Sequence, residues 1–279
     1  MVTHSNDLII RMNSKQITYR QFEDKEHAQL YAKYRPSYPK ELYDKIRMFC
    51  RQSDGNELAL AIDVGCGSGQ STLPLTNICN HVIGIDVSRE QIAEARKAAS
   101  VIDFRVGQAE DLSFLGDGTV DLVTTATAIH WMDIPTFMGE VSRVLRPGGV
   151  VAVYSIGTDT IHNKEAHQLV WEDLYTKTLG DYWIDTKFHI DNGLAMIELP
   201  FADSIREEPL LIKREVEIDS YVGLFSTWSS WRRFQEKNPE SNALGELRTR
   251  LRTLYRDEKS GEVRPIDLTT PIYMLLGRK

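Results

Sequence analysis

Short apolar runs alternate with helical patterns over residues 58–156, and this alternation constrains the fold more than any other feature. Runs with the length and composition of buried strands occur at 58–63, 81–86, 102–107, 120–127 and 150–156. After the second run, Ser88 precedes a segment in which Ile92 and Ala95 fall on one helical face. Strands that alternate with helices predict a parallel, doubly wound α/β sheet with helices on both faces.

Two more helices are expected between these strands. One follows the first strand over residues 70–77, with Pro74 in its first turns, and the other starts at Asp133 and Pro135. Residues 147–149 (PGG) are expected to end the latter helix, because proline and glycine both interrupt helical structure.

Beyond residue 157 the alternation is lost. The expected elements are helices over 163–180 and 241–257 and a last strand over 266–279. Residues 1–57 and about 180–245 are interpreted as additions that cover one edge or mouth of the sheet. The chain is thus expected to have an N-terminal arm with lid helices, 1–57, and a main domain, 58–279, that carries the lid insertion.

Charge and cysteine content exclude several classes of protein. The net charge of −7 and the isoelectric point near 5.6 argue against a nucleic-acid-binding surface. Cys50, Cys66 and Cys79 have neither disulfide-framework nor zinc-site spacing, and no metal site is expected among the histidines. No signal peptide or membrane span is recognised, so we expect a cytoplasmic protein. We also expect a monomer or weak dimer.

A glycine-rich loop follows the first strand. That strand ends in Asp63, and Gly65, Gly67 and Gly69 follow at alternate positions. Glycine allows a tight turn and a close approach of the backbone to a ligand, and ligands of open α/β sheets bind beyond the carboxyl ends of the strands. The dinucleotide fingerprint has its third glycine where this chain has Gln70, which disfavours a nicotinamide-dependent dehydrogenase.

Asp86 ends the second strand, where its carboxylate can accept hydrogen bonds from both hydroxyls of a ribose. Together with the glycine loop, this side chain predicts a site for a cofactor that contains a nucleoside. The alternative is a loop that only makes a tight turn in a protein without a cofactor.

Four segments, in this order along the chain, resemble the motifs of class I S-adenosylmethionine-dependent methyltransferases: 63–69, 84–88, 108–112 and 145–149. The resemblance covers about residues 58–156. It implies a Rossmann-like, doubly wound, seven-stranded sheet and an enzyme that transfers a methyl group. It also implies S-adenosyl-L-methionine as the cofactor and S-adenosyl-L-homocysteine as the product.

The resemblance also assigns cofactor-binding residues. The glycine loop would hold the methionine part, Asp63 would orient its amino group, and the Ala109 backbone would reach the adenine. Gln108 stands where many relatives carry an acidic residue. The complete set of candidates is Asp63, Gly65, Cys66, Gly67, Gly69, Asp86, Val87, Gln108, Ala109, Glu110, Thr125 and Tyr38.

Three flanking segments, 31–39, 128–133 and 226–234, extend the similarity to small-molecule methyltransferases related to trans-aconitate methyltransferase. This resemblance implies a small-molecule acceptor and favours a carboxylate oxygen, which would become a methyl ester. A carboxylate is already a nucleophile at pH 7 and needs no base, but it needs a cationic partner, for which arginine is best suited.

The flanks also supply the candidates for chemistry on the acceptor. Arg35 is the candidate carboxylate clamp, and His130 is the candidate base or hydrogen-bond donor. The candidate substrate contacts are Trp131, Trp228, Trp231 and Arg232. The structural alternatives are a surface charge for Arg35, a satisfied structural histidine for His130 and core packing for the tryptophans.

Other functions remain open at this point. One is methylation of a nitrogen or hydroxyl of a small metabolite with His130 as base, and another is a non-catalytic, cofactor-binding partner protein. Methylation of base amino groups is disfavoured, because residues 125–131 (TATAIHW) lack an N-P-P-Y-type tetrad.

Overall fold

The computed structural model describes residues 25–35, 37–51 and 58–279. The N-terminal arm expected before residue 25 lies outside this described part. The described strands are β1 (Leu58–Val64), β2 (Cys79–Asp86), β3 (Asp103–Val106), β4 (Val120–Ala126), β5 (Leu145–Ile156), β6 (Thr160–Ile161), β7 (Asp203–Arg206), β8 (Leu210–Val216) and β9 (Ile266–Arg278).

The helices around these strands differ in length and in hydrogen-bonding pattern. The α-helices are α2 (Lys25–Tyr34), α3 (Lys40–Arg51), α4 (Arg89–Ala98), α5 (Ile134–Val144), α6 (Lys164–His167), α7 (Phe188–Asp191), α8 (Ile218–Phe225), α9 (Ser229–Lys237) and α10 (Ala243–Leu254). Short 3-10 helices are η2 (Leu73–Asn77), η3 (Ile129–Trp131), η5 (Gly180–Tyr182) and η6 (Asp185–Lys187), and η4 (Gln168–Thr178) is a π-helix.

The sheet has the predicted doubly wound, mainly parallel architecture. Its central order is β3-β2-β1-β4-β5-β9, in which β1 to β5 are parallel and β9 is antiparallel to β5. The two helix starts expected at Ser88 and Asp133 are confirmed, and both residues are N-caps. Ser88 accepts a hydrogen bond from the Gln91 backbone and Asp133 accepts one from the Thr136 backbone.

The described residues form nine strands, which corrects the expected number of seven. These strands lie side by side in only seven positions, because two of the positions each hold two strands in line. Leu268 of β9 pairs with Ile161 of β6 and with Arg214 of β8, which places these two strands on opposite edges of β9. β5 continues the line of β6, and β7 continues the line of β8. Residues 157–159 and 207–209 interrupt the two lines, so that each of these two positions in the sheet holds two strands.

Alternate residues of β5 pack in two different apolar cores. Ala152 and Tyr154 belong to the core that contains side chains of α3 and α4, whereas Val151 and Val153 belong to the core under α5. Since successive side chains of a strand point to opposite faces, helices cover both faces of the sheet. Burial on both faces explains why the central strands are continuous apolar runs in the sequence.

The segment after the glycine loop differs from the prediction. Instead of a regular helix over 70–77, the chain forms turns and then the five-residue 3-10 helix η2. Pro74 lies in this helix and provides no backbone N–H. The hydroxyls of Ser71 and Thr72 donate to Asp63. A regular α-helix is therefore absent at this position of the described chain.

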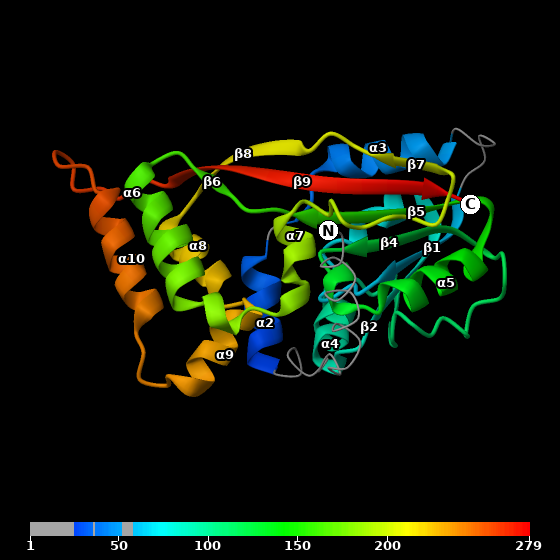
Figure 1. Ribbon diagram of the computed structural model, residues 1–279, viewed down its shortest axis with the longest axis horizontal. Coiled ribbons are helices and arrows are strands. Elements are labelled where there is room, and N and C mark those ends of the chain that lie inside the picture. Colours follow the sequence, from blue (N-terminus) through cyan, green and yellow to red (C-terminus); the bar gives the residue numbers. More distant parts are fainter. Residues whose placement is uncertain (1–24, 36, 52–57) are drawn as a thin grey trace, which may run out of the picture.

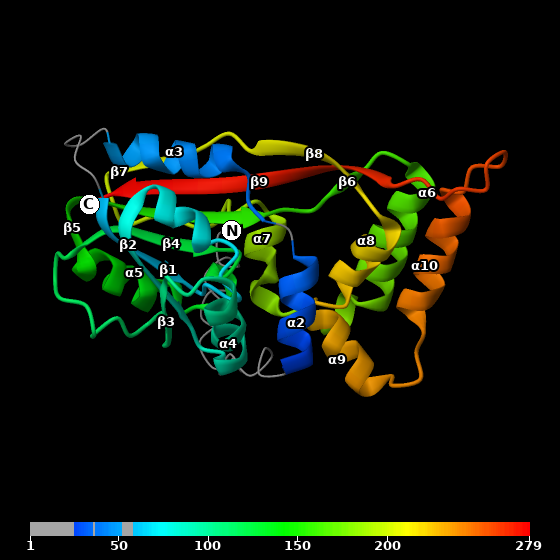
Figure 2. The ribbon, with the colours of Figure 1, turned by 180° about the vertical axis from the view of Figure 1, so that it is seen from behind.

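A helical cap lies at the opposite end of the molecule from α5, as Figures 1 and 2 show, and β9 runs from it along the whole sheet. Side chains of α6, η4, α8 and α10 form its separate apolar core, which includes Leu169, Tyr221, Phe225 and Leu251. The cap therefore includes helices on both sides of the expected insertion at 180–245. Helix α2 contacts both α4 of the sheet region and α8 of the cap. Within the described chain, no helix has the length and apolar character needed to span a bilayer.

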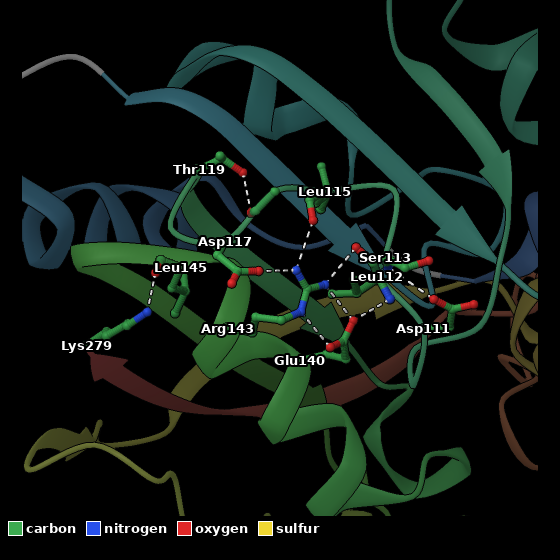
Figure 3. Close-up of polar contacts among 11 residues, drawn as sticks. Asp111, Leu112, Ser113, Leu115, Asp117, Thr119, Glu140, Arg143, Leu145 and Lys279 are labelled. Carbon is green, nitrogen blue, oxygen red and sulfur yellow. Dashed lines mark hydrogen bonds and ion pairs between the residues drawn. The ribbon is translucent and has the colours of Figure 1, made fainter.

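Arg143 of α5 fixes the loop that leads from β3 to β4 (Figure 3). Its guanidinium donates to the carbonyl oxygens of Leu112 and Leu115, both at 3.0 Å, and to the carboxylates of Asp117 and Glu140. Glu140 in turn accepts a hydrogen bond from the Leu112 backbone at 2.7 Å. This loop begins with the motif 108–112, so the network holds that motif beside the carboxyl end of β3.

Candidate active site

Two adjoining cavities lie at the carboxyl ends of the parallel strands. The smaller, of about 40 Å³, is lined by the glycine loop, and the larger, of about 120 Å³, extends toward the cap. Tyr31, Arg35, Thr127 and Ile156 line both cavities. A molecule held against the glycine loop would therefore meet a molecule in the larger cavity at these four residues.

The backbone of the glycine loop has a conformation that favours glycine. Gly65, Gly67 and Gly69 have φ values of +73°, +54° and +87°. A Cβ on Gly65 would lie 2.5 Å from the Cβ of Ala128, whereas one on Gly67 would have only the Tyr31 ring, at 3.8 Å, as a neighbour. Gly65 thus permits close packing of the loop, and Gly67 keeps the smaller cavity open.

Asp63 is completely buried and is hydrogen-bonded within the protein. Its carboxylate accepts hydrogen bonds from the hydroxyls of Ser71, Thr72 and Thr124 at 2.7–2.8 Å. Burial raises the pKa of Asp63, while these three hydrogen bonds act in the opposite direction. Asp63 does not line either cavity. Its direct role in the structure is to tie the end of the glycine loop to β4.

Asp86 connects the glycine loop to the start of α4. One carboxylate oxygen accepts from the Gly67 backbone and the other from the Ser88 backbone, both at 2.9 Å. Burial raises the pKa of Asp86, and the two backbone hydrogen bonds oppose this shift. Because each carboxylate oxygen can accept more than one hydrogen bond, Asp86 retains acceptor capacity for ribose hydroxyls.

The expected adenine border lies beyond both cavities. Ala109 is buried, Gln108 is exposed and Val87 is half-buried. Glu110 accepts a hydrogen bond from the Asp133 backbone at 2.8 Å, which links the loop after β3 to the start of α5. These residues stay candidates for the cofactor, and their positions at neighbouring strand ends agree with the order of the motifs.

Thr127 is a residue of both cavities that the sequence reasoning missed. It has a φ of +50°, a rare conformation for a β-branched residue, and its hydroxyl is hydrogen-bonded to that of Tyr38 at 2.6 Å. Tyr38 also packs edge-on against Tyr154, and burial raises its pKa, so it remains a neutral phenol. Thr125 is the residue that the sequence predicts for the cofactor at this strand end, and its buried hydroxyl has no hydrogen-bond partner in the described chain.

Arg35 stands at the boundary of the two cavities. Its Nε donates to the hydroxyl of Thr227 at 3.0 Å, and its guanidinium lies 4.7 Å from the centre of the Tyr31 ring. Among the described residues, no carboxylate is close enough to form an ion pair with it. The N-terminal segment is thereby joined to the cap, and a guanidinium faces the place where the cavities meet.

His130 lines the larger cavity and is a very weak base. It is buried, and its Nδ1 has no hydrogen-bond partner among the described residues. Burial, together with the positive charges of Lys187 and Arg35, lowers the pKa of His130 to about 3. The imidazole is therefore neutral at pH 7.

An aromatic wall forms the side of the larger cavity that faces the cap. We define it as Trp171, Tyr175, Trp183 and Trp228, in which the centres of neighbouring rings lie 4.6–6.2 Å apart. The Lys187 ammonium lies 5.5 Å above the Tyr175 ring and 5.1 Å above the Trp183 ring. It also pairs with Asp191.

The structure brings only part of the expected acceptor set together. Trp131 and Trp228 line the larger cavity with His130 and Arg35, whereas Trp231 and Arg232 are not among the lining residues. Trp231 packs against Phe234 instead. The sequence reasoning did not find the residues contributed by η4 and the segment after it, because aromatic side chains in a helix are more often part of a core.

The glycine loop, the acidic ends of β1 and β2 and the adjoining cavities on a doubly wound sheet are the features of a cofactor-binding protein of the α/β class. A family model described as "Methyltransferase domain" matches residues 62–153. A Dictyostelium discoideum protein named as a methyltransferase is 34% identical over 271 residues, 96% of this chain and 100% of that protein. The chain therefore belongs to the class I S-adenosylmethionine-dependent methyltransferases, and its cofactor is S-adenosylmethionine.

Two further comparisons agree with this assignment. A Saccharomyces cerevisiae protein named as an S-adenosylmethionine-dependent methyltransferase is 35% identical over 57% of this chain and 56% of that protein. The solved structure of a protein named as a type II methyltransferase, from Anaeromyxobacter dehalogenans, has a TM-score of 0.71 and 29% identity. It matches 88% of this chain and 98% of that chain. The solved structure thus matches this chain over most of its length.

Proposed function

We propose that this enzyme transfers the methyl group of S-adenosylmethionine to a carboxylate oxygen of a small molecule bound in the larger cavity. The product is a methyl ester. The observation that carries the proposal is a combination of two groups around one cavity. The Arg35 guanidinium has no carboxylate partner among the described residues, and His130 is too weakly basic to deprotonate an acceptor at pH 7.

The smaller cavity supports the assignment of the cofactor residues. The backbone of Gly65, Cys66 and Gly67 lines it without bulky side chains, which suits the methionine part of the cofactor. Asp86 accepts a hydrogen bond from the Gly67 backbone of this loop and can accept further hydrogen bonds from the ribose. Cys66 is buried, and burial raises its thiol pKa, which argues against thiolate chemistry.

For this reaction the protein needs mainly to position the acceptor carboxylate and to exclude water. When bound, S-adenosylmethionine supplies an electrophilic methyl carbon on a positively charged sulfur. The acceptor oxygen would form the new O–C bond with its own electron pair, the electron pair of the C–S bond would stay on sulfur, and no proton would move. Arg35 would hold the acceptor carboxylate at the junction of the cavities, and the aromatic side chains would exclude water.

The charge of the larger cavity supports an anionic acceptor. Arg35, Lys187 and Arg214 line it. Arg214 is paired with Asp159 and Lys187 with Asp191, which leaves Arg35 as the lining cation without a carboxylate partner among the described residues. A relative from Pectobacterium atrosepticum, 30% identical over 43% of this chain and 50% of that protein, is named malonyl-[acyl-carrier protein] O-methyltransferase. The name of this relative is consistent with transfer to oxygen.

Methylation of an amine or hydroxyl is the competing function. Such an acceptor must lose a proton, and general bases work best when their pKa lies near the working pH. The pKa of His130, about 3, is far below that range. A non-catalytic cofactor-binding protein would not require a second cavity at the boundary of the cofactor cavity.

The test uses S-adenosylmethionine with a labelled methyl group and matched small acids, amines and phenols, followed by mild base. Base-labile label from acids identifies a methyl ester and supports the proposal. Base-stable label from amines or phenols would contradict it.

Arg35→Ala should lower kcat/KM for an active acid at least about 100-fold, with a smaller effect on S-adenosylhomocysteine affinity. Arg248→Ala, at an exposed position on α10, is the matched control for loss of an arginine. Equal kinetics of the Arg35 variant and the control would remove Arg35 from the site.

A further inference from the structure

We propose that the preferred acceptor is an aromatic carboxylic acid whose ring carries a hydrogen-bond-accepting group at the end remote from the carboxylate. This inference rests on the proposed function and adds the chemical class of the part of the acceptor that lies beyond its carboxylate. The residues that carry it are the aromatic wall, and within the wall the indole nitrogen of Trp171.

The aromatic wall is assembled from three separate parts of the chain. Trp171 and Tyr175 come from η4, Trp183 follows η5, and Trp228 precedes α9. Tyr175 meets Trp228 at an interplanar angle of 90°, and Trp171 and Trp228 are tilted by 30°. An aromatic ring in the cavity could therefore find both edge-to-face and offset partners, which favour a planar π-system over a saturated group of the same size.

The same wall does not suit a cationic acceptor. Aromatic cages bind ammonium groups through free ring faces. Here the ammonium of Lys187 already lies over Tyr175 and Trp183, and the guanidinium of Arg35 lies over Tyr31. These cations also repel a second positive charge. The wall is therefore suited to the neutral, apolar part of an anion.

Trp171 adds a requirement at the far end of the acceptor. Its Nε1 is buried and has no hydrogen-bond partner among the described residues, whereas the Nε1 of Trp183 donates to the Tyr175 carbonyl oxygen at 3.2 Å. An indole N–H is a donor only, and a buried donor without a partner is unfavourable. An oxygen of the acceptor would satisfy it.

The orientation of the acceptor follows from which residues line which cavity. Arg35 lines both cavities, but Trp171 lines only the larger one. With its carboxylate at Arg35, close to the methyl donor, an acceptor extends its ring into the aromatic wall. In this orientation, a substituent that reaches Trp171 would lie on the side of the ring opposite the carboxylate.

The experiment is calorimetric titration of the full chain loaded with S-adenosylhomocysteine, which allows acceptors to bind without turnover. The probes are phenylpropanoic acid, its saturated isostere cyclohexylpropanoic acid, and para-methoxyphenylpropanoic acid. We expect the phenyl acid to bind at least about threefold more tightly than the cyclohexyl acid. The methoxy group should improve binding a further fivefold or so.

Trp171→Phe keeps an aromatic ring and removes only the donor. The variant should no longer bind the methoxy acid more tightly than the phenyl acid, but it should still prefer the phenyl acid to the cyclohexyl acid. The retained preference for phenyl shows that the cap is still folded. A methoxy advantage that persists in the variant would overturn the role of Trp171.

The outcomes separate this inference from the proposed function. If the cyclohexyl acid binds as well as the phenyl acid while acids are still converted to base-labile esters, the aromatic preference fails and ester formation stands. If no acid binds and none is methylated, both fail.

Discussion

Two alanine substitutions in the glycine loop should differ in their main effect. Gly65→Ala should mainly lower the stability of the fold, and Gly67→Ala should mainly weaken cofactor binding. Gly65 and Gly67 both have positive φ values, so an alanine at either position costs about 1–2 kcal/mol in backbone strain. The surroundings differ, since a Cβ at Gly65 would approach Ala128 to 2.5 Å and a Cβ at Gly67 would face the open cavity beside Tyr31.

The magnitudes follow from these distances. Carbon atoms in ordinary contact are about 3.5–4.0 Å apart, so the approach to Ala128 is an overlap of about 1 Å or more. Overpacking of a core costs about 1–3 kcal/mol, which gives a total of about 2–5 kcal/mol for Gly65→Ala. Gly67→Ala should lose only about 1–2 kcal/mol of stability.

The affinity for S-adenosylhomocysteine should follow the reverse order, with the larger loss in Gly67→Ala. The Cβ added by Gly67→Ala occupies space in the smaller cavity, so we expect the affinity for S-adenosylhomocysteine to fall at least about tenfold in a variant that is still folded. Urea unfolding measures the stability of both variants, and calorimetric titration measures their affinity.

Equal destabilisation by the two substitutions would refute the packing argument at Gly65. Unchanged affinity of Gly67→Ala would refute the placement of the cofactor against this loop.

Three further predictions concern single side chains. Asp86→Ala should weaken S-adenosylhomocysteine binding at least about tenfold by calorimetry, and unchanged affinity would remove Asp86 from the ribose site. Ser88→Ala should destabilise the protein by about 1 kcal/mol in urea unfolding, because α4 loses its N-cap. The pKa of His130 is about 3 in the folded chain and about 6.5 when unfolded. The unfolded chain therefore binds the extra proton, and stability should fall by up to about 1.4 kcal/mol per pH unit as the pH drops from 6.5 toward 3. His130→Asn should show a correspondingly smaller slope between pH 6 and pH 4, and an identical slope would contradict the buried, neutral histidine.

Local patterns were sufficient to predict the sheet and the cofactor motifs. A buried strand and a capped helix depend on residues two to four positions apart, which explains why the Ser88 and Asp133 caps and the central strands were predicted correctly. The helix expected after the glycine loop was wrong for a reason that is not local. The hydroxyls of Ser71 and Thr72 bind Asp63 in the structure, and Pro74 lies within the short 3-10 helix.

The sequence by itself therefore determined the class of fold, the methyltransferase motifs and the carboxyl-end position of the site. Only the tertiary structure decided the composition of the acceptor cavity. Arg35 meets Thr227 across 192 positions of sequence, and Trp171, Trp183 and Trp228 converge although no short-range pattern relates them. The physical reason is that strands and helix caps arise from interactions between near neighbours, whereas a cavity wall depends on how distant elements pack.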